Sequence, residues 1–304
     1  MSSAKSTYRW FTGIWGVLLI GWGIAQFVLL GTGPCGFLWN SASYYLVAAG
    51  PDALGRGAAT EHDNAPFSTS LLGGIASFVL GLSYLLQVIG DEASSTSMWS
   101  DTLAQINHRF RPSRWITWGI VFALLFTQVS FIAGIKDAWL IAALAVMSVS
   151  LHYKQSQNEA LNTDIISTEY ERTSSEKAAL LQKTVDPKTG GISFEKWPRV
   201  EAWTFALITF LFVALAWIFA LANANTSSGS VEILAWSCVL ITIIFYAVLH
   251  IVILFYLTNY NVGAWDENMF TREYAYIFVI NFILLFVTIT SVWGFPHSSH
   301  ACPS

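Results

Sequence analysis

Residues 202–223 read AWTFALITFLFVALAWIFALAN, an unbroken run that contains no charged side chain. A helix rises about 1.5 Å per residue, so a run of about 20 apolar residues crosses the roughly 30 Å hydrocarbon core of a bilayer. Such a run is expected to be helical, because backbone polar groups cannot be left unpaired in lipid. Similar runs recur along the chain, and we expect seven transmembrane helices at 10–31, 68–90, 114–134, 137–153, 200–223, 231–258 and 272–294.

The composition of the whole chain agrees with this assignment. Hydrophobic residues make up 54% of the 304 residues, charged residues make up 11%, and the mean hydropathy is +0.53. Soluble domains carry about 25% charged residues. We therefore expect an all-α, multi-pass integral membrane protein with a single domain over residues 1–304, surrounded by the lipid bilayer. The net charge of −4 gives no reason to expect a nucleic-acid partner.

Lysine and arginine are distributed unevenly between the two sets of loops. The chain has 15 of these residues, and all except Arg56 and Lys136 lie before the first span or beside the second, fourth and sixth loops. Basic residues accumulate on the cytoplasmic-type side of a membrane. We therefore expect the N-terminus inside and the C-terminus outside.

Two connecting segments are long. Residues 32–67 form an outer loop with glycine, proline and asparagine, a composition that allows a hairpin. Residues 154–199 form an inner loop whose first part, to about Leu181, contains good helix formers. This part either extends the fourth span or lies on the membrane surface, so we expect the loop to be partly helical.

The chain lacks the common catalytic motifs. It has no HExxH, CxxC or GxSxG sequence and no glycine-rich phosphate loop. Cys35, Cys238 and Cys302 do not have the spacing of a metal site. Cys35 and Cys302 are both expected on the outer side, where they either form a disulfide or remain free thiols. We therefore expect neither an enzyme nor a metal site.

Polar groups are sparse inside the expected spans. His250 is interpreted either as a hydrogen-bonded core histidine or as a proton relay. Gln128 and Asn281 are interpreted as hydrogen-bonding groups between helices. Three glutamates lie near span ends, where water or headgroups would solvate them: Glu201, Glu232 and Glu273. The glycines of the first two spans are expected to be close-packing sites between helices: Gly13, Gly16, Gly21, Gly23, Gly73, Gly74 and Gly81.

Several short motifs follow one another along the chain. They are Arg114-Trp115-Ile116 and Gly134-Ile135-Lys136-Asp137 at the ends of the third span, Asn158-Glu159, Trp197-Pro198, Asn259-Tyr260 with Gly263, and the run from Trp265 through Glu273 to Tyr276. In this order and spacing the motifs resemble those of heliorhodopsins, a family of seven-helix membrane proteins with the N-terminus inside. The resemblance covers nearly the whole chain and implies a rhodopsin-like bundle.

The same resemblance implies that this chain cannot hold retinal covalently. The family binds retinal to a lysine of helix seven as a protonated Schiff base, but this chain has no lysine after Lys196, and Leu284 stands at the equivalent position. A buried cation also needs a carboxylate partner, and the position of that counterion is Thr117. Leu19 and Tyr84 stand where the family has histidines. We therefore expect no covalent cofactor.

These observations favour a retinal-free, non-catalytic accessory or structural subunit of a membrane complex. Its partners would be other membrane-protein subunits or a second copy of the chain, and the inner loop, longer than the family's, is the candidate binding surface. An alternative is a receptor or sensor that binds a retinoid, carotenoid or lipid without a covalent bond. Another is proton or ion transport along His250, Gln128, Tyr246 and Asn281. The residues expected near a ligand pocket are Thr117, Gln128, His250, Asn281 and Leu284.

Overall fold

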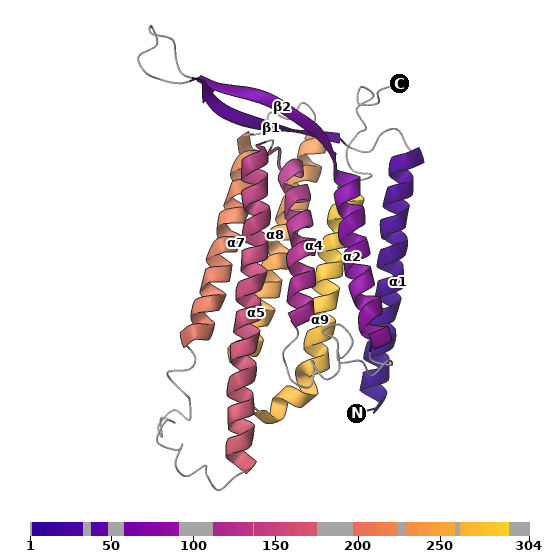
Figure 1. The fold of residues 1–304 in the computed structure, drawn as a ribbon, viewed down its shortest axis with the longest axis vertical. Coiled ribbons are helices and arrows are strands. Elements are labelled where there is room, and N and C mark those ends of the chain that lie inside the picture. Colours follow the sequence, from indigo (N-terminus) through magenta and orange to yellow (C-terminus); the bar gives the residue numbers. More distant parts are fainter. Residues whose placement is uncertain are drawn as a thin grey trace.

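The computed structural model describes residues 2–32, 38–47, 58–90, 112–135, 137–174, 197–223, 229–258 and 262–291. Within these ranges the chain forms seven helices that run alternately up and down in one bundle (Figure 1). The helix α1 begins at the lower end of the bundle in this view, and α9 ends at the upper end. The elements are α1 (Ser2–Thr32), β1 (Leu38–Val47), β2 (Ala58–Ser68), α2 (Thr69–Gly90), α4 (Pro112–Ile132), α5 (Ala138–Ser174), α7 (Trp197–Asn223), α8 (Gly229–Thr258) and α9 (Val262–Ile289).

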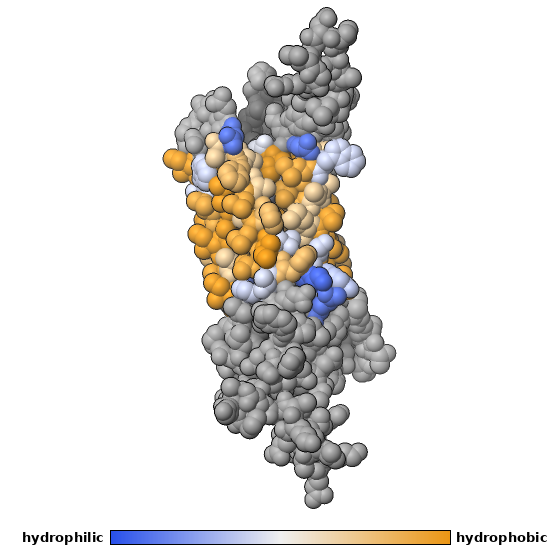
Figure 2. Space-filling view, turned by 90° about the vertical axis from the view of Figure 1, so that its left-hand side faces the viewer, coloured by the Kyte–Doolittle hydropathy of each residue, from blue (hydrophilic) through white to orange (hydrophobic). Residues whose placement is uncertain are grey.

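Five helices contain stretches that are long and apolar enough to cross a membrane, and α9 contains a shorter apolar stretch, Glu273–Ile289. Large apolar side chains cover the outside of the bundle, and the exposed fraction reaches 75% for Trp139 and 73% for Trp10. Figure 2 shows a mostly hydrophobic band, in orange, across the middle of the visible face. A surface of this kind suits lipid, because soluble proteins rarely expose large continuous apolar patches.

The strands β1 and β2 form an antiparallel hairpin with an irregularity between Asn40 and Ala42. They occupy the segment 32–67, where the sequence allows a hairpin. The hairpin lies across the upper end of the bundle in Figure 1, and β1 contacts α5. A two-stranded sheet is marginally stable alone, so this contact with the bundle contributes to its stability.

The helix α5 continues past residue 153, where the fourth span was predicted to end. It has 37 residues, which at about 1.5 Å per residue gives a rod of roughly 55 Å. The first part of the predicted inner loop therefore extends the helix, and its lower end projects beyond the neighbouring helices (Figure 1). At the other end of α5, the backbone N–H of Leu140 donates to the Asp137 carboxylate at 2.7 Å, an N-cap.

A tight turn joins α4 to α5. Gly134 has a φ of 86°, a left-handed conformation that glycine adopts without steric cost. The N–H of Gly134 donates to the carbonyl of Phe131, and the N–H of Ile135 donates to that of Ser130, both at 2.9 Å. This pair of bonds closes the end of α4 in the manner of a Schellman motif.

Glycines bring α1 and α2 into backbone contact. A Cβ atom added to Gly81 would lie 2.8 Å from the carbonyl oxygen of Gly16, and one added to Gly23 would lie 2.9 Å from that of Gly74. The prediction of close packing is right at these positions. It is wrong for Gly21, where a Cβ atom would meet nothing within 4 Å.

Candidate functional site

The bundle encloses an ion pair between α4 and α9, near the end at which α1 begins. Arg114 Nη1 lies 2.5 Å from Glu273 Oε1, and the two side chains are 4% and 1% exposed. The guanidinium carbon also lies 4.9 Å from the ring centre of Tyr276, 5.1 Å from that of Trp115 and 5.4 Å from that of Trp118. The expectation that water or headgroups solvate Glu273 is wrong, because the chain buries this carboxylate against a cation.

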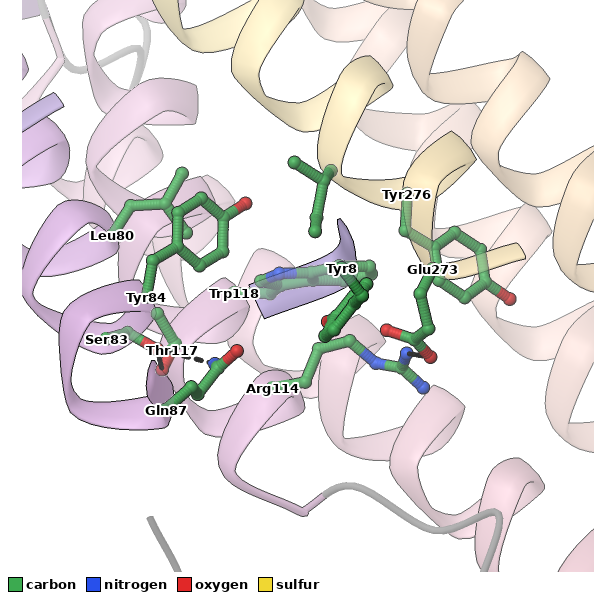
Figure 3. Close-up of a pocket in the computed structure, with 11 residues that line it drawn as sticks. Tyr8, Leu80, Ser83, Tyr84, Gln87, Arg114, Thr117, Trp118, Glu273 and Tyr276 are labelled. Carbon is green, nitrogen blue, oxygen red and sulfur yellow. Dashed lines mark hydrogen bonds and ion pairs between the residues drawn. The ribbon is translucent and has the colours of Figure 1, made fainter. Parts of the chain in front are cut away.

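A small cavity adjoins the ion pair (Figure 3). Its volume is about 10 Å³, close to the smallest space that holds one water molecule. It is therefore too small for a retinoid or a lipid chain. The residues that line it are Tyr8, Leu80, Ser83, Tyr84, Gln87, Arg114, Thr117, Trp118, Glu273, Tyr276 and Ile277.

Neutral hydrogen bonds connect α2 and α4 along one wall of this cavity. Thr117 Oγ1 lies 2.9 Å from the carbonyl oxygen of Ser113 and 3.2 Å from Ser83 Oγ. Since the carbonyl can only accept, the Thr117 hydroxyl donates to it and accepts from Ser83. Gln87 Nε2 then donates to Ser83 Oγ at 3.3 Å. The position that the resemblance equates with the counterion is thus part of an uncharged hydrogen-bond chain.

Two of the positions that the resemblance singles out lie in closed apolar packing: Leu284, equated with the retinal-binding lysine, and Leu19, equated with a histidine. Leu284 and Leu19 are both fully buried, with 0% of their surface exposed. Neither side chain therefore borders a space that admits a water molecule. Tyr84, which the resemblance equates with another histidine position, is 4% exposed and donates its hydroxyl to Asn281 Oδ1 at 3.3 Å. Protein atoms fill this part of the bundle.

A second polar cluster lies between α5 and α8. His152 Nδ1 lies 2.7 Å from the carbonyl oxygen of Ser148, which can only accept, so this nitrogen carries the proton. Nε2 of His152 is then an acceptor, and the hydroxyl of Tyr246 donates to it at 3.2 Å. His250 Nδ1 likewise donates to the carbonyl of Tyr246 at 2.9 Å. Both histidines are therefore buried groups of the core that make hydrogen bonds within the bundle.

Aromatic rings surround this histidine cluster. Phe122 stacks on His152 with 4.9 Å between the ring centres, and Phe210 stacks on His250 at 5.6 Å. Phe126 meets Tyr246 edge to face at 5.5 Å. Stacking and edge-to-face contacts are the favoured arrangements of such rings. The cluster therefore joins α4, α5, α7 and α8 through packing as well as through hydrogen bonds.

The residues predicted to line one ligand pocket lie in different places. Of the five, Thr117 alone borders the small cavity, and Asn281 is connected to its wall through Tyr84. Gln128, on α4, donates to Ser291, just beyond the end of α9, at 2.9 Å in a separate contact. His250 lies in the histidine cluster, and Leu284 lies in the apolar core. Cys35 and Cys302 lie outside the described residues, whereas Cys238 is a buried free thiol.

The sequence analysis did not predict the ion pair between Arg114 and Glu273 or the hydrogen bond between His152 and Tyr246. A signal for the ion pair exists, because Arg114 opens the third predicted span and Glu273 is the second residue of the seventh, so that opposite charges occur at the same end of two spans. His152 lies at the end of the fourth predicted span, but the sequence does not tell which helix it faces. Its partner Tyr246 lies 94 residues away.

The described part of the chain contains no group of three histidine, cysteine, aspartate or glutamate side chains that could hold a metal ion. Neither the known protein families nor the curated proteins provide a match to this chain. The geometry is therefore the basis on which a function is inferred. Within the described residues it offers a bundle in which Arg114 is paired with Glu273 and polar side chains connect several of the helices.

Proposed function

We propose that this chain is a retinal-free, heliorhodopsin-like membrane protein that acts as a non-catalytic structural subunit of a membrane complex. The observations that carry the proposal are the closed apolar packing at Leu284 and the small size of the cavity at Thr117, about 10 Å³. Leu284 is 0% exposed and Thr117 is 2% exposed. A light-driven protein of the rhodopsin kind needs a chromophore at the centre of its bundle, and among the described residues side chains occupy the space around Leu284.

The proposal includes seven membrane spans, with α5 and α9 added to the five long apolar helices. The alternating direction of the helices in Figure 1 supports an odd number of crossings. The concentration of lysine and arginine beside one set of loops supports an N-terminus inside and a C-terminus outside. Protease accessibility in sealed vesicles tests this topology. An N-terminal tag and the segment 154–199 on opposite sides of the membrane would refute it.

The packing argues against the two alternatives. A receptor for a retinoid, carotenoid or lipid needs a largely apolar pocket of several hundred Å³, whereas the cavity at Thr117 measures about 10 Å³. A proton path needs groups that gain and lose protons in sequence. Of the residues suggested for the path, Gln128 bonds Ser291 and Asn281 accepts from Tyr84, in contacts separate from the histidine cluster.

The projecting half of α5 supports a role in assembly. This helix is roughly 25 Å longer than the hydrocarbon core of a bilayer requires, and its sequence beyond residue 157 is mostly polar. An extended polar helix on one side of the membrane is suited to contact another subunit or a second copy of the chain. The long predicted inner loop that follows it enlarges the available surface.

The decisive experiment is extraction of the protein from its native membrane in mild detergent, followed by size-exclusion chromatography with light scattering and a full absorption spectrum. The proposal expects elution in an assembly larger than the 33.6 kDa chain, without a visible band, before and after addition of retinal. Elution as a monomer after extraction from the native membrane would refute the subunit role. A visible band that persists through purification would refute the retinal-free interior.

A further inference from the structure

We draw no further inference here: the strongest candidate, the outer face of α7 on which Phe205, Phe212 and Phe219 are exposed at intervals of seven residues, is an apolar surface of the bundle, and nothing in the structure shows whether lipid or a partner helix covers it.

Discussion

The ion pair between Arg114 and Glu273 can be broken with almost no change of shape by Glu273→Gln. Removing one partner of a buried pair typically costs about 3–5 kcal/mol, because the remaining charge stays in a site that water does not reach. The aromatic rings around the guanidinium are kept in the variant, and each such contact retains about 0.5–2 kcal/mol of attraction. We therefore expect Glu273→Gln to lower the free energy of unfolding by about 3 kcal/mol.

The assay is unfolding of the purified protein in a fixed detergent, followed by tryptophan fluorescence. Trp115 and Trp118, which both contact the guanidinium, are two of the fourteen tryptophans whose summed emission reports unfolding. A double-mutant cycle with Arg114→Met separates the pair from its surroundings. Removing both charges together is often neutral, so we expect the double variant to be more stable than Glu273→Gln alone.

A matched control uses a cation outside the core. Lys154 is half-buried and lies 5.5 Å from the ring centre of Phe205, and a cation–π contact that water still reaches contributes about 0.5–1 kcal/mol. Lys154→Gln should therefore leave unfolding nearly unchanged. The reasoning fails if Glu273→Gln is as mild as this control. It also fails if the effects at Arg114 and Glu273 simply add, because the two side chains would then not be energetically coupled.

The remaining predictions concern the helix contacts and the core, and each is measured by the same unfolding assay. Gly81→Ala should be destabilising, because its new Cβ atom would press on the backbone of α1. Gly21→Ala has open space and should be neutral or slightly stabilising. Equal effects of the two substitutions would contradict the close contact at Gly81. Tyr246→Phe should lower the free energy of unfolding by about 1–3 kcal/mol, because it leaves a buried histidine nitrogen without its donor. Tyr153→Phe, at a side chain that is 62% exposed, should cost little. If Tyr246→Phe leaves the free energy of unfolding unchanged, the hydrogen bond contributes nothing to stability. Leu284→Lys should destabilise by several kcal/mol through a buried ammonium group, whereas Leu284→Met should cost less than about 1.5 kcal/mol.

The sequence predicts the apolar helices well, because crossing a bilayer imposes a length and a composition that are visible without any partner. The five long apolar helices overlap the expected spans at 10–31, 68–90, 114–134, 200–223 and 231–258. The course of the chain after Tyr153 is less determined, because the same helix formers serve a continued helix and a surface helix equally well. Only the three-dimensional arrangement selects the continuation to Ser174.

The partners of buried polar groups could not be predicted for a different reason. The depth of a residue in the membrane follows from its position in a span, so the sequence places Glu273 near the membrane surface, where water reaches it. Its burial depends on the direction in which the side chain leaves α9 and on the presence of Arg114 on α4, and neither is encoded locally. His152 and Tyr246 pose the same problem, because a histidine surrounded by apolar residues has the same sequence pattern whether it faces lipid or a tyrosine.

The resemblance to heliorhodopsins implies that side chains at positions 284 and 117 can reach each other, and this can be tested without retinal. If Leu284 and Thr117 occupy the lysine and counterion positions, the long side chain of a lysine introduced at position 284 reaches a carboxylate introduced at position 117. Leu284→Lys alone then buries an unpaired cation, whereas Leu284→Lys combined with Thr117→Glu supplies the carboxylate that such a cation needs. We expect the double variant to recover at least about 1 kcal/mol relative to the sum of the two single variants. Strict additivity would show that the two side chains do not reach each other, and the assignment of a retinal-free rhodopsin interior would then lose its geometric support.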